Sequence, residues 1–319
     1  MKRKILDIIR KKKSFLISTH VHPDPDAICS ILALGIFLRQ RGKKVTMLLE
    51  EKVPKRYAFF PTAKLLRKFQ ARKTYPYDAA IILDCGDLDR IGRVSEALDP
   101  KKPVLNIDHH ITNTKFGTLN HVIAKASSTA EVLYDILKAG RAQFNPSLAL
   151  NLYAGIMTDT GSFRYENTTS KTHAIVSDLL KYNISTSELY RKIYERIPLK
   201  DLTAFTKVIN GFQTYDRGKI VSVVLTKRVH KSFSENFDLR DAIFKFLRSI
   251  QGVQVIFIAT EVDQKTTRVN FRSTSRVDVA KIASHFDGGG HRRASGCQID
   301  KPLKVAKARV LKHIHKVMG

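Results

Sequence analysis

The sequence predicts an α/β protein with a parallel sheet in its N-terminal part and a smaller α/β unit in its C-terminal part. In the first half, short and almost wholly apolar runs alternate with helical patterns, which is typical of parallel strands covered on both faces. A polar, almost entirely helical stretch follows over residues 171–209, and after it the pattern changes to strands joined by tight turns. The 319 residues are enough for two domains.

The apolar runs of the first half define the predicted parallel strands. They are rich in Ile, Leu, Val and Ala and are bounded by polar or turn-forming residues. Between the first two runs, residues 27–41 are apolar on all sides, which indicates a buried helix. The predicted strands are 14–18, 44–49, 79–83 and 103–107.

Two more helices are predicted before the helical stretch. Ser128 is a predicted N-cap for the helix that runs to residue 139, with Glu131 as its capping-box partner. The second helix covers residues 146–157. The helical stretch then serves as a connector between the two domains.

The C-terminal unit begins with a turn at 215–218 and a strand at 219–225. Residues 253–262 and 266–272 form a predicted hairpin, with one helix between the strand pairs and another at 277–286. We therefore expect an N-terminal domain over residues 1–185 that carries the chemistry, a helical linker over 186–208 and a second domain over 209–319.

The composition is that of a globular protein with an unusual charge. Hydrophobic residues make up 43% and charged residues 27% of the chain, and 56 Lys and Arg against 29 Asp and Glu leave a net charge of +27. Such a charge attracts polyanions, nucleic acids among them. A lysine-rich solvated surface without a polyanionic partner has the same composition, so charge alone leaves both interpretations open.

Several features favour a cytoplasmic protein without a membrane partner. The longest apolar stretch, 27–38, has 12 residues, whereas a membrane-spanning helix needs about 20. The basic N-terminus lacks the apolar core and the cleavage site of a secretory signal peptide. The three cysteines, Cys29, Cys85 and Cys297, cannot form an even disulfide framework, and this favours a reducing compartment.

Four short segments concentrate Asp and His at the ends of predicted elements. Two of them directly follow apolar strands, another lies at the end of a third strand, and the fourth lies at the end of a helix. Ligands of open α/β sheets bind at the carboxyl ends of the strands, so these side chains can converge at one site. The segments are 19–27, 83–87, 106–110 and 155–161.

Carboxylates and imidazoles gathered in one cleft require a cation, because they otherwise repel each other or lose solvation. Two divalent ions about 3.5–4 Å apart would neutralise the cluster and suit phosphoryl hydrolysis. A donor set of Asp and His without Cys favours Mn²⁺, with Mg²⁺, Co²⁺ or Zn²⁺ as alternatives. Each segment taken singly fits ordinary capping or turn chemistry, and their combination is what favours a site.

Together the four segments resemble the motifs of the DHH phosphoesterase superfamily, which is named after the triplet at Asp108, His109 and His110. A fifth segment over 286–296 contains Gly-Gly-Gly-His and is similar to the signature of the DHH-associated C-terminal domain, as is the upstream stretch 270–283. The resemblance covers most of the chain. By its two-domain size, the chain is most similar to the bacterial oligoribonucleases (nanoRNases) that also dephosphorylate 3′-phosphoadenosine 5′-phosphate (pAp).

The resemblance implies a two-metal site in which Asp84 bridges both ions. His110 would act beside the scissile phosphate, and Asp108 would orient the histidines from behind. His22 occupies a variable position of the first motif and is expected to be an extra imidazole without a ligand role. The first ion would be held by His20, Asp24 and Asp84. The second would be held by Asp26, Asp84, His109 and Asp159.

The glycine-rich segment is expected to bind substrate. Three glycines let the backbone approach a phosphate closely and direct amides toward it, and His291 and Arg272 add donors. A flexible surface turn is the alternative for such a run. The predicted substrate-binding residues are Arg272, Ser273, Gly288, Gly289, Gly290 and His291.

The function that the resemblance implies is hydrolysis of short oligoribonucleotides (nanoRNA) to mononucleotides and of pAp to AMP. Water activated by the two ions would attack phosphorus in line, without a covalent intermediate. The expected partner is a short single-stranded RNA or nucleotide substrate, and a dimer remains open. The alternatives are a phosphodiesterase for cyclic or linear dinucleotides (c-di-AMP or pApA), a RecJ-like single-strand exonuclease and a polyanion-binding module without catalysis.

Overall fold

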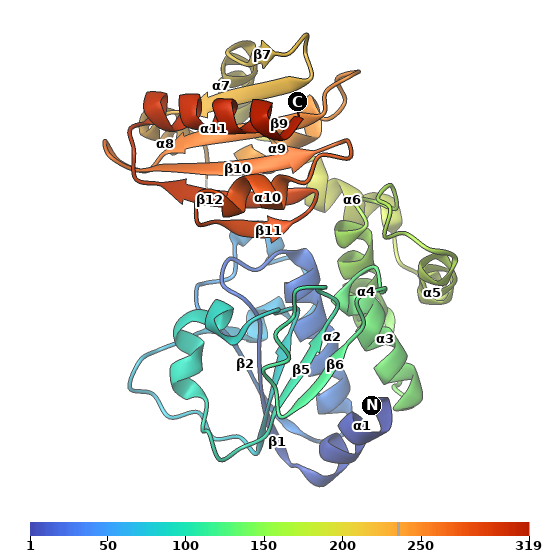
Figure 1. Cartoon of the computed structure of the whole chain (residues 1–319). Coiled ribbons are helices and arrows are strands. Elements are labelled where there is room, and N and C mark those ends of the chain that lie inside the picture. Colours follow the sequence, from blue (N-terminus) through green and yellow to red (C-terminus); the bar gives the residue numbers. More distant parts are fainter. Residues whose placement is uncertain (235–236, 319) are drawn as a thin grey trace. The chain divides into compact units, whose positions relative to one another are not determined.

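The chain, described here from a computed structural model for residues 1–234 and 237–318, divides into two compact units (Figure 1). The units comprise Met1–Ile193 and Tyr194–Gly319. Their boundary falls inside the segment 186–208 that we expected to be a linker. The last residue of the predicted second domain, 319, lies outside the described residues.

The first unit is built on a six-stranded, wholly parallel sheet with the strand order β3-β2-β1-β4-β5-β6. The predicted α/β class is confirmed. Three strands have their predicted bounds, and the fourth is displaced by one residue. The two outermost strands were not predicted, because three or four residues are too few to establish a period. The strands are β1 (Ser14–Ser18), β2 (Lys44–Leu49), β3 (Leu66–Lys68), β4 (Ala79–Leu83), β5 (Val104–Asp108) and β6 (Leu119–Val122).

Helices cover one face of this sheet. The predicted buried helix is α2 (Pro25–Gln40), whose side chains are almost all buried because it is packed between the strands and the neighbouring helices. In Figure 1, α2, α3 and α4 stand side by side on this face. The other helices are α1 (Lys2–Lys11), α3 (Thr129–Ala139), α4 (Pro146–Asp159), α5 (Ser170–Leu180) and α6 (Thr186–Tyr194). Two short 3₁₀ helices, η1 (Lys55–Tyr57) and η2 (Ala63–Leu65), precede β3.

The opposite face is covered by an irregular layer. The 3₁₀ segment η3 (Leu88–Ala97) and the chain over 69–77 pack aromatic and aliphatic side chains onto the sheet, among them Phe69, Tyr75 and Ile91. Both faces are therefore buried, which explains the continuous apolar runs of the strands. The short connections before and after β4 contain no α-helix.

The capping box expected at α3 is only half formed. Ser128 caps the helix as predicted, since its hydroxyl accepts a hydrogen bond from the amide of Glu131 at 3.0 Å. The Glu131 carboxylate does not return to the Ser128 amide. It accepts instead from the hydroxyls of Ser127 at 2.6 Å and Thr172 at 2.9 Å. A buried carboxylate takes the nearest strong donors, and here α5 supplies one of them.

The second unit contains a six-stranded mixed sheet with the order β11-β12-β10-β9-β8-β7. The predicted hairpin is the antiparallel pair β9 and β10, whereas β8 and β9 are parallel. Strands β7, β11 and β12 and the C-terminal helix were not predicted. The strands are β7 (Gln213–Tyr215), β8 (Ile220–Leu225), β9 (Val255–Glu261), β10 (Thr267–Ser273), β11 (Gly289–His291) and β12 (Ala294–Ile299).

Helices pack on both faces of this second sheet. One core joins the sheet to α10 and α11, and the other joins it to α7 and α9. The helices are α7 (Leu199–Asn210), α8 (Lys227–Ser232), α9 (Leu239–Leu247), α10 (Val279–Ser284) and α11 (Leu303–Met318). Within the described ranges of both units, no helix is both long and apolar enough to cross a membrane.

The packing of α5 against α3 predicts an acid-sensitive contribution to stability. Asp178 accepts hydrogen bonds from the Tyr134 hydroxyl at 2.6 Å and from Lys138 at 2.9 Å. These bonds lower the pKa of Asp178 to about 2, below the value of about 3.9 in an unfolded chain. We expect Asp178→Asn to lower the free energy of unfolding by about 1–2 kcal/mol at pH 7. The difference should shrink as the pH falls from about 4 toward 2, where the carboxylate becomes protonated.

Urea denaturation across this pH range measures the effect. Asp7→Asn is a suitable control, because the partner of Asp7 among the described residues is the exposed Arg10, and such a pair contributes about 0–1 kcal/mol. A stability difference for Asp178→Asn that is the same at pH 7 and at pH 3 would contradict the prediction.

Candidate metal centre

The predicted ligands meet at the carboxyl edge of the first sheet. The chain leaves β1 toward β2 on one side, and β4 lies on the other side of β1, so the strand order reverses here. Such a switch point is where open α/β sheets bind ligands. His20 follows β1, Asp84 follows β4, and Asp108 ends β5 directly before His109. Asp159 is the last residue of α4.

Asp84 lies at the centre of this arrangement. Its Oδ2 is 3.7 Å from Nε2 of His20, and its Oδ1 is 3.6 Å from Nε2 of His109 and 3.7 Å from Nδ1 of His110. The side chain is buried, and the backbone has a positive φ of 52°. This left-handed conformation is uncommon for a residue with a side chain, although Asp tolerates it better than most. The strained turn directs the carboxylate into the cluster.

Two histidines present their Nε2 atoms to the carboxylates. Nδ1 of His20 is 2.8 Å from the carbonyl oxygen of Val21, and Nδ1 of His109 is 3.3 Å from that of Ala126. A carbonyl oxygen only accepts, so Nδ1 carries a proton, and in the neutral ring Nε2 keeps its lone pair. Nε2 of His109 is also 3.4 Å from Oδ2 of Asp159. Backbone contacts of this kind fix the tautomer that binds metals.

The N-terminus of α3 holds two carboxylates in place. The amides of Thr129 and Ala130 donate to the two oxygens of Asp26 at 2.8 and 3.1 Å. The hydroxyl of Thr129 donates to Oδ1 of Asp84 at 2.9 Å. Helix N-termini favour anions because their first amides lack partners within the helix. Asp26 also requires a close approach of α4, since a Cβ on Gly155 would lie 2.6 Å from its Oδ1.

Carboxylates of the cluster raise the pKa values of their neighbours, and a bound cation would relieve this repulsion. Burial and the charges of Asp84 and Asp159 raise the pKa of Asp26 well above its usual range. Burial and the charges of Asp24 and Asp84 raise the pKa of Asp159 to about 7, against the opposing effect of His109. Several carboxylates so close together are costly to ionise by themselves. A divalent ion would allow all of them to be charged.

Asp108 and His110 form a separate pair beside the cluster. Oδ1 of Asp108 accepts from Nδ1 of His110 at 2.7 Å and from the amide of His109 at 2.8 Å. Burial disfavours the charged imidazole, but the hydrogen bond to Asp108 and the nearby carboxylates raise the pKa of His110 to about 9. Nδ2 of Asn113 donates to the other oxygen of Asp108 at 2.6 Å. This pair therefore places a positively charged donor at the edge of the cluster.

Three groups of side chains have donor atoms that all lie within 4.8 Å of one another. The first group coincides with the predicted ligands of one ion, and the second contains three of the four predicted ligands of the other. The third brings His110 next to Asp84 and His109, so His110 lies as near to the cluster as the predicted ligands do. The groups are His20, Asp24 and Asp84; Asp26, His109 and Asp159; and Asp84, His109 and His110.

The donor chemistry fits divalent ions that prefer oxygen and imidazole ligands. Burial raises the pKa of Cys85 to about 12, and its sulfur contacts the carbonyl oxygen of Asp87 at 3.0 Å, so this thiol stays neutral and takes no part. His22 is exposed, and its Nδ1 lies 3.3 Å from Glu51. It belongs to none of the groups found among the described residues.

The predicted substrate-binding residues of the second unit lie around β10 and β11. The last two glycines of the run belong to the short edge strand β11, which pairs with β12, so the run is not the flexible surface turn that was the alternative. A Cβ on Gly288 would lie 2.3 Å from the carbonyl oxygen of Gly296, and one on Gly290 would lie 2.7 Å from that of Ala294, whereas Gly289 faces open space. Close strand packing therefore explains two of the three glycines.

Arg272 and His291 share one row across this sheet. Both are paired in register with Ala294, one from β10 and the other from β11, and residues in one row point to the same face. The guanidinium of Arg272 lies over the ring of Phe244 at 4.7 Å. Ser273 is buried, and its hydroxyl donates to the carbonyl oxygen of Ser275 at 3.2 Å. The binding roles of all six residues stay predictions.

Sequence reasoning missed the residues that hold the ligands. Thr129, Asn113 and Gly155 make the contacts described above, and none of them carries a charge or a recognisable ligand spacing. Gly155 and Thr129 stand in helical patterns where packing or capping is the simplest interpretation. Only the tertiary structure places them against Asp26, Asp84 and Asp108.

Comparison with known proteins places the chain among relatives of the same two-domain organisation. The pattern of the DHH family, N-terminal domain, matches residues 14–156, and that of the DHHA1 domain matches residues 220–318. The "Bifunctional oligoribonuclease and PAP phosphatase NrnA" of Bacillus subtilis is 29% identical over 94% of this chain and 93% of its own length. The "Probable bifunctional oligoribonuclease and PAP phosphatase NrnA" of Streptococcus mutans is 30% identical over 92% of this chain and 91% of its own length.

A solved structure shares the fold. The crystal structure of an exopolyphosphatase-related protein from Bacteroides fragilis is similar with a TM-score of 0.90 and 24% sequence identity, over 98% of this chain and 94% of the other. At 24% identity, the likeness to this structure shows a shared fold. The sequence relatives also match the chain over both domains. From the matched domains and these relatives, we conclude that the chain belongs to the DHH family of phosphoesterases and carries the DHHA1 domain as its second unit.

Proposed function

We propose that this protein is a metal-dependent phosphoesterase that hydrolyses short oligoribonucleotides to mononucleotides and pAp to AMP. The observation that carries the proposal is the grouping of Asp84 with three other carboxylates and three imidazoles at the switch point of the sheet. The names of the full-length relatives, oligoribonuclease and PAP phosphatase, support the substrate class. The expected partner is accordingly a short RNA or a nucleotide.

The two ligand sets are proposed to hold two divalent ions, with Mn²⁺ as the first choice. His20, Asp24 and Asp84 would hold one ion, and Asp84 would be shared with the other. Ions held in this way supply Lewis-acid polarisation of the phosphoryl oxygens and lower the pKa of a water molecule. The carboxylate and imidazole donors support Mn²⁺, Mg²⁺, Co²⁺ or Zn²⁺ over metals that prefer sulfur. The full second set is Asp26, Asp84, His109 and Asp159.

His110 is proposed to act on the substrate, as the sequence analysis expected. Its ring is held by Asp108, and its raised pKa keeps it protonated at neutral pH. An imidazolium at this position can donate a hydrogen bond to a phosphoryl oxygen on which charge develops during in-line attack. Asp108 is then a positioning residue, because it contacts the two histidines and lies in none of the ligand groups among the described residues.

The row of Arg272 and His291 in the second unit is proposed to contact a substrate phosphate. Both side chains point to one face of the sheet, and the open space over Gly289 leaves its backbone accessible. Arginine and histidine are suited to a phosphate because they donate several hydrogen bonds. Gly288 and Gly290 would support this surface by allowing β11 to pack closely.

A comparison of four substrates tests the proposed function. With Mn²⁺ present, we expect release of AMP from pAp and of mononucleotides from a short oligoribonucleotide, with little turnover of cyclic di-AMP or pyrophosphate. A chelator should abolish both reactions. A preference for cyclic di-AMP would transfer the function to dinucleotide turnover, and no hydrolysis of any of the four would refute the proposal.

The shared carboxylate gives the sharpest test of the metal centre. We expect Asp84→Asn to reduce the rate of pAp hydrolysis by about 10³-fold or more, because a neutral amide cannot offset the charge of two ions. Asp87→Asn is a matched control, since Asp87 caps η3 and belongs to no ligand group of the described residues. Equal rates for these two variants at saturating Mn²⁺ would speak against the assignment.

The hydroxyl of Thr129 is predicted to position Asp84 for metal binding. Thr129→Val removes the hydrogen bond to Asp84 but keeps the backbone amide that holds Asp26. We expect the affinity for Mn²⁺, measured by calorimetric titration, to fall by about 10–100-fold, as is typical when a ligand loses its supporting hydrogen bond. Thr129→Ser should restore most of the affinity. Unchanged binding by the valine variant would show that the hydroxyl has only a structural role.

A further inference from the structure

The stretch from Lys52 to Tyr77 is the most basic part of the chain that lacks acidic residues. It contains eight Lys and Arg and no Asp or Glu. The stretch after Asp300 also lacks acidic residues, but it contains six Lys and Arg. The net charge of +27 is therefore not spread evenly. The eight residues are Lys52, Lys55, Arg56, Lys64, Arg67, Lys68, Arg72 and Lys73.

Six of these side chains are exposed and are paired with no carboxylate of the described residues. We call these six residues the basic edge, because they surround or belong to β3, the edge strand of the first sheet. Unpaired cations that lie close together repel each other, so an anionic partner would stabilise them. The basic edge consists of Lys52, Lys64, Arg67, Lys68, Arg72 and Lys73.

Two parts of the basic edge leave the sheet on the same side as the metal centre. β2 runs parallel to β1, so its carboxyl end, from which Lys52 follows, lies beside the end of β1. Glu51 contacts His22, within the loop that carries the first ligands, at 3.3 Å. The amide of Phe69 donates to the carbonyl oxygen of Leu49 at 2.8 Å. The turn that carries Arg72 and Lys73 therefore begins at this same edge.

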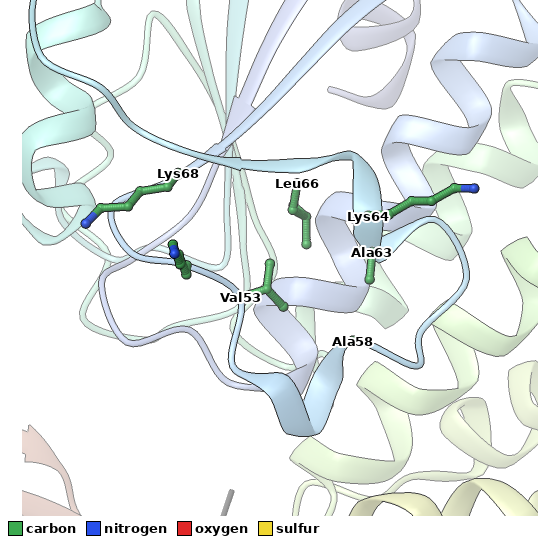
Figure 2. Close-up of a pocket in the computed structure, with 7 residues that line it drawn as sticks. Val53, Ala58, Ala63, Lys64, Leu66 and Lys68 are labelled. Atoms are coloured by element: carbon green, nitrogen blue, oxygen red, sulfur yellow. The ribbon is translucent and has the colours of Figure 1, made fainter. Parts of the chain in front are cut away.

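A hollow in the basic edge combines apolar and cationic surface. Its lining includes Val53, Ala63 and Leu66, together with Lys52, Lys64 and Lys68. Figure 2 shows the lysine side chains at positions 64 and 68 extending outward on opposite sides of the shorter apolar side chains. Apolar side chains flanked by lysines suit a sugar–phosphate backbone, whose riboses are less polar than the phosphates between them.

Protection of a sheet edge accounts for only part of this charge. Lysine and arginine on an edge strand discourage pairing with other chains, which is a sufficient reason for Arg67 and Lys68. Lys52 and Arg72 lie outside the strand, so edge protection does not require them. The aromatic rings of the stretch, such as Tyr57, are mostly buried and offer little surface for base stacking. The surface therefore suits recognition of phosphates without regard to base sequence.

We propose that the basic edge binds the phosphodiester backbone of single-stranded RNA longer than the oligonucleotides that fill the metal centre. It would hold such an RNA beside the site and would thereby influence which chain lengths the protein retains. This inference rests on the proposed function for the nature of the ligand. It concerns a surface of the first unit that contains none of the predicted catalytic, metal-ligating or substrate-binding residues.

The test compares RNA binding by two variants with the same change in charge. One carries Arg67→Gln, Lys68→Gln, Arg72→Gln and Lys73→Gln. The other carries Lys304→Gln, Arg309→Gln, Lys312→Gln and Lys316→Gln on the exposed side of α11. Binding of a labelled single-stranded RNA of about 16 nucleotides is measured by fluorescence anisotropy in EDTA, which prevents cleavage. The salt concentration is varied from about 50 to 200 mM.

We expect the variant of the basic edge to bind this RNA at least about tenfold more weakly. The slope of log K against log salt should fall by about 3, because each lost phosphate contact on a single strand contributes about 0.7. The α11 variant should bind as the parent protein does, and hydrolysis of pAp should be the same in all three. Parental binding by the first variant, or an equal loss in both, would overturn the proposal.

A failure of the proposed RNA-binding surface can be distinguished from a failure of the proposed function. If the parent protein binds RNA through the basic edge but hydrolyses neither pAp nor a dinucleotide, the proposed function fails and the surface stands. If it hydrolyses both substrates but the first variant binds RNA normally, the surface is refuted and the enzyme stands. Circular dichroism of both variants verifies that a loss of binding does not arise from unfolding.

Discussion

The first unit depends on one constraint, the close grouping of carboxylates around Asp84. Carboxylates at such distances repel each other and resist burial, so every neighbouring element contributes something that offsets the repulsion. α3 directs its first amides at Asp26 and a hydroxyl at Asp84. The histidines at the ends of β1 and β5 add imidazoles, and α4 approaches closely enough only because residue 155 is glycine. What the protein does not supply is the positive charge of a divalent ion.

The predicted metal ligands lie at the ends of strands and helices, and this placement holds them in position at one edge of the sheet. Asp84 and His109 directly follow the strands β4 and β5, and Asp159 is the last residue of α4. Each of these predicted ligands is therefore positioned by the end of a strand or helix, at the edge of the sheet where open α/β proteins bind ligands. His110 lies between the positioning residue and the predicted ligands, because its ring is held by Asp108 and also lies near Asp84.

In this interpretation, positive charge acts on the substrate at two places, the predicted metal centre and the basic edge. At the centre, the proposed metal ions and His110 would act on one phosphoryl group, where the interaction is strong because the surroundings are buried. At the basic edge, exposed lysines and arginines would act on a chain of phosphates through many weak, salt-dependent contacts. The sequence shows only the sum of both as a net charge. The structure separates them in space, since four carboxylates meet at the centre while the cations of the stretch from Lys52 to Tyr77 surround the edge strand β3.

The sequence by itself determined the fold class and most of the central strands, and it singled out the Asp and His residues that the structure groups around Asp84. Buried parallel strands are continuous apolar runs, and Asp and His repeated at the ends of such runs indicate a ligand site, so both signals are local. Only the tertiary structure decided the roles of Thr129, Asn113 and Gly155, the partner of Glu131, and the edge strands β3, β6, β7 and β11. Those features depend on contacts between residues far apart in the chain, and a short edge strand or a neutral hydroxyl carries no periodicity or charge by which a sequence can reveal it.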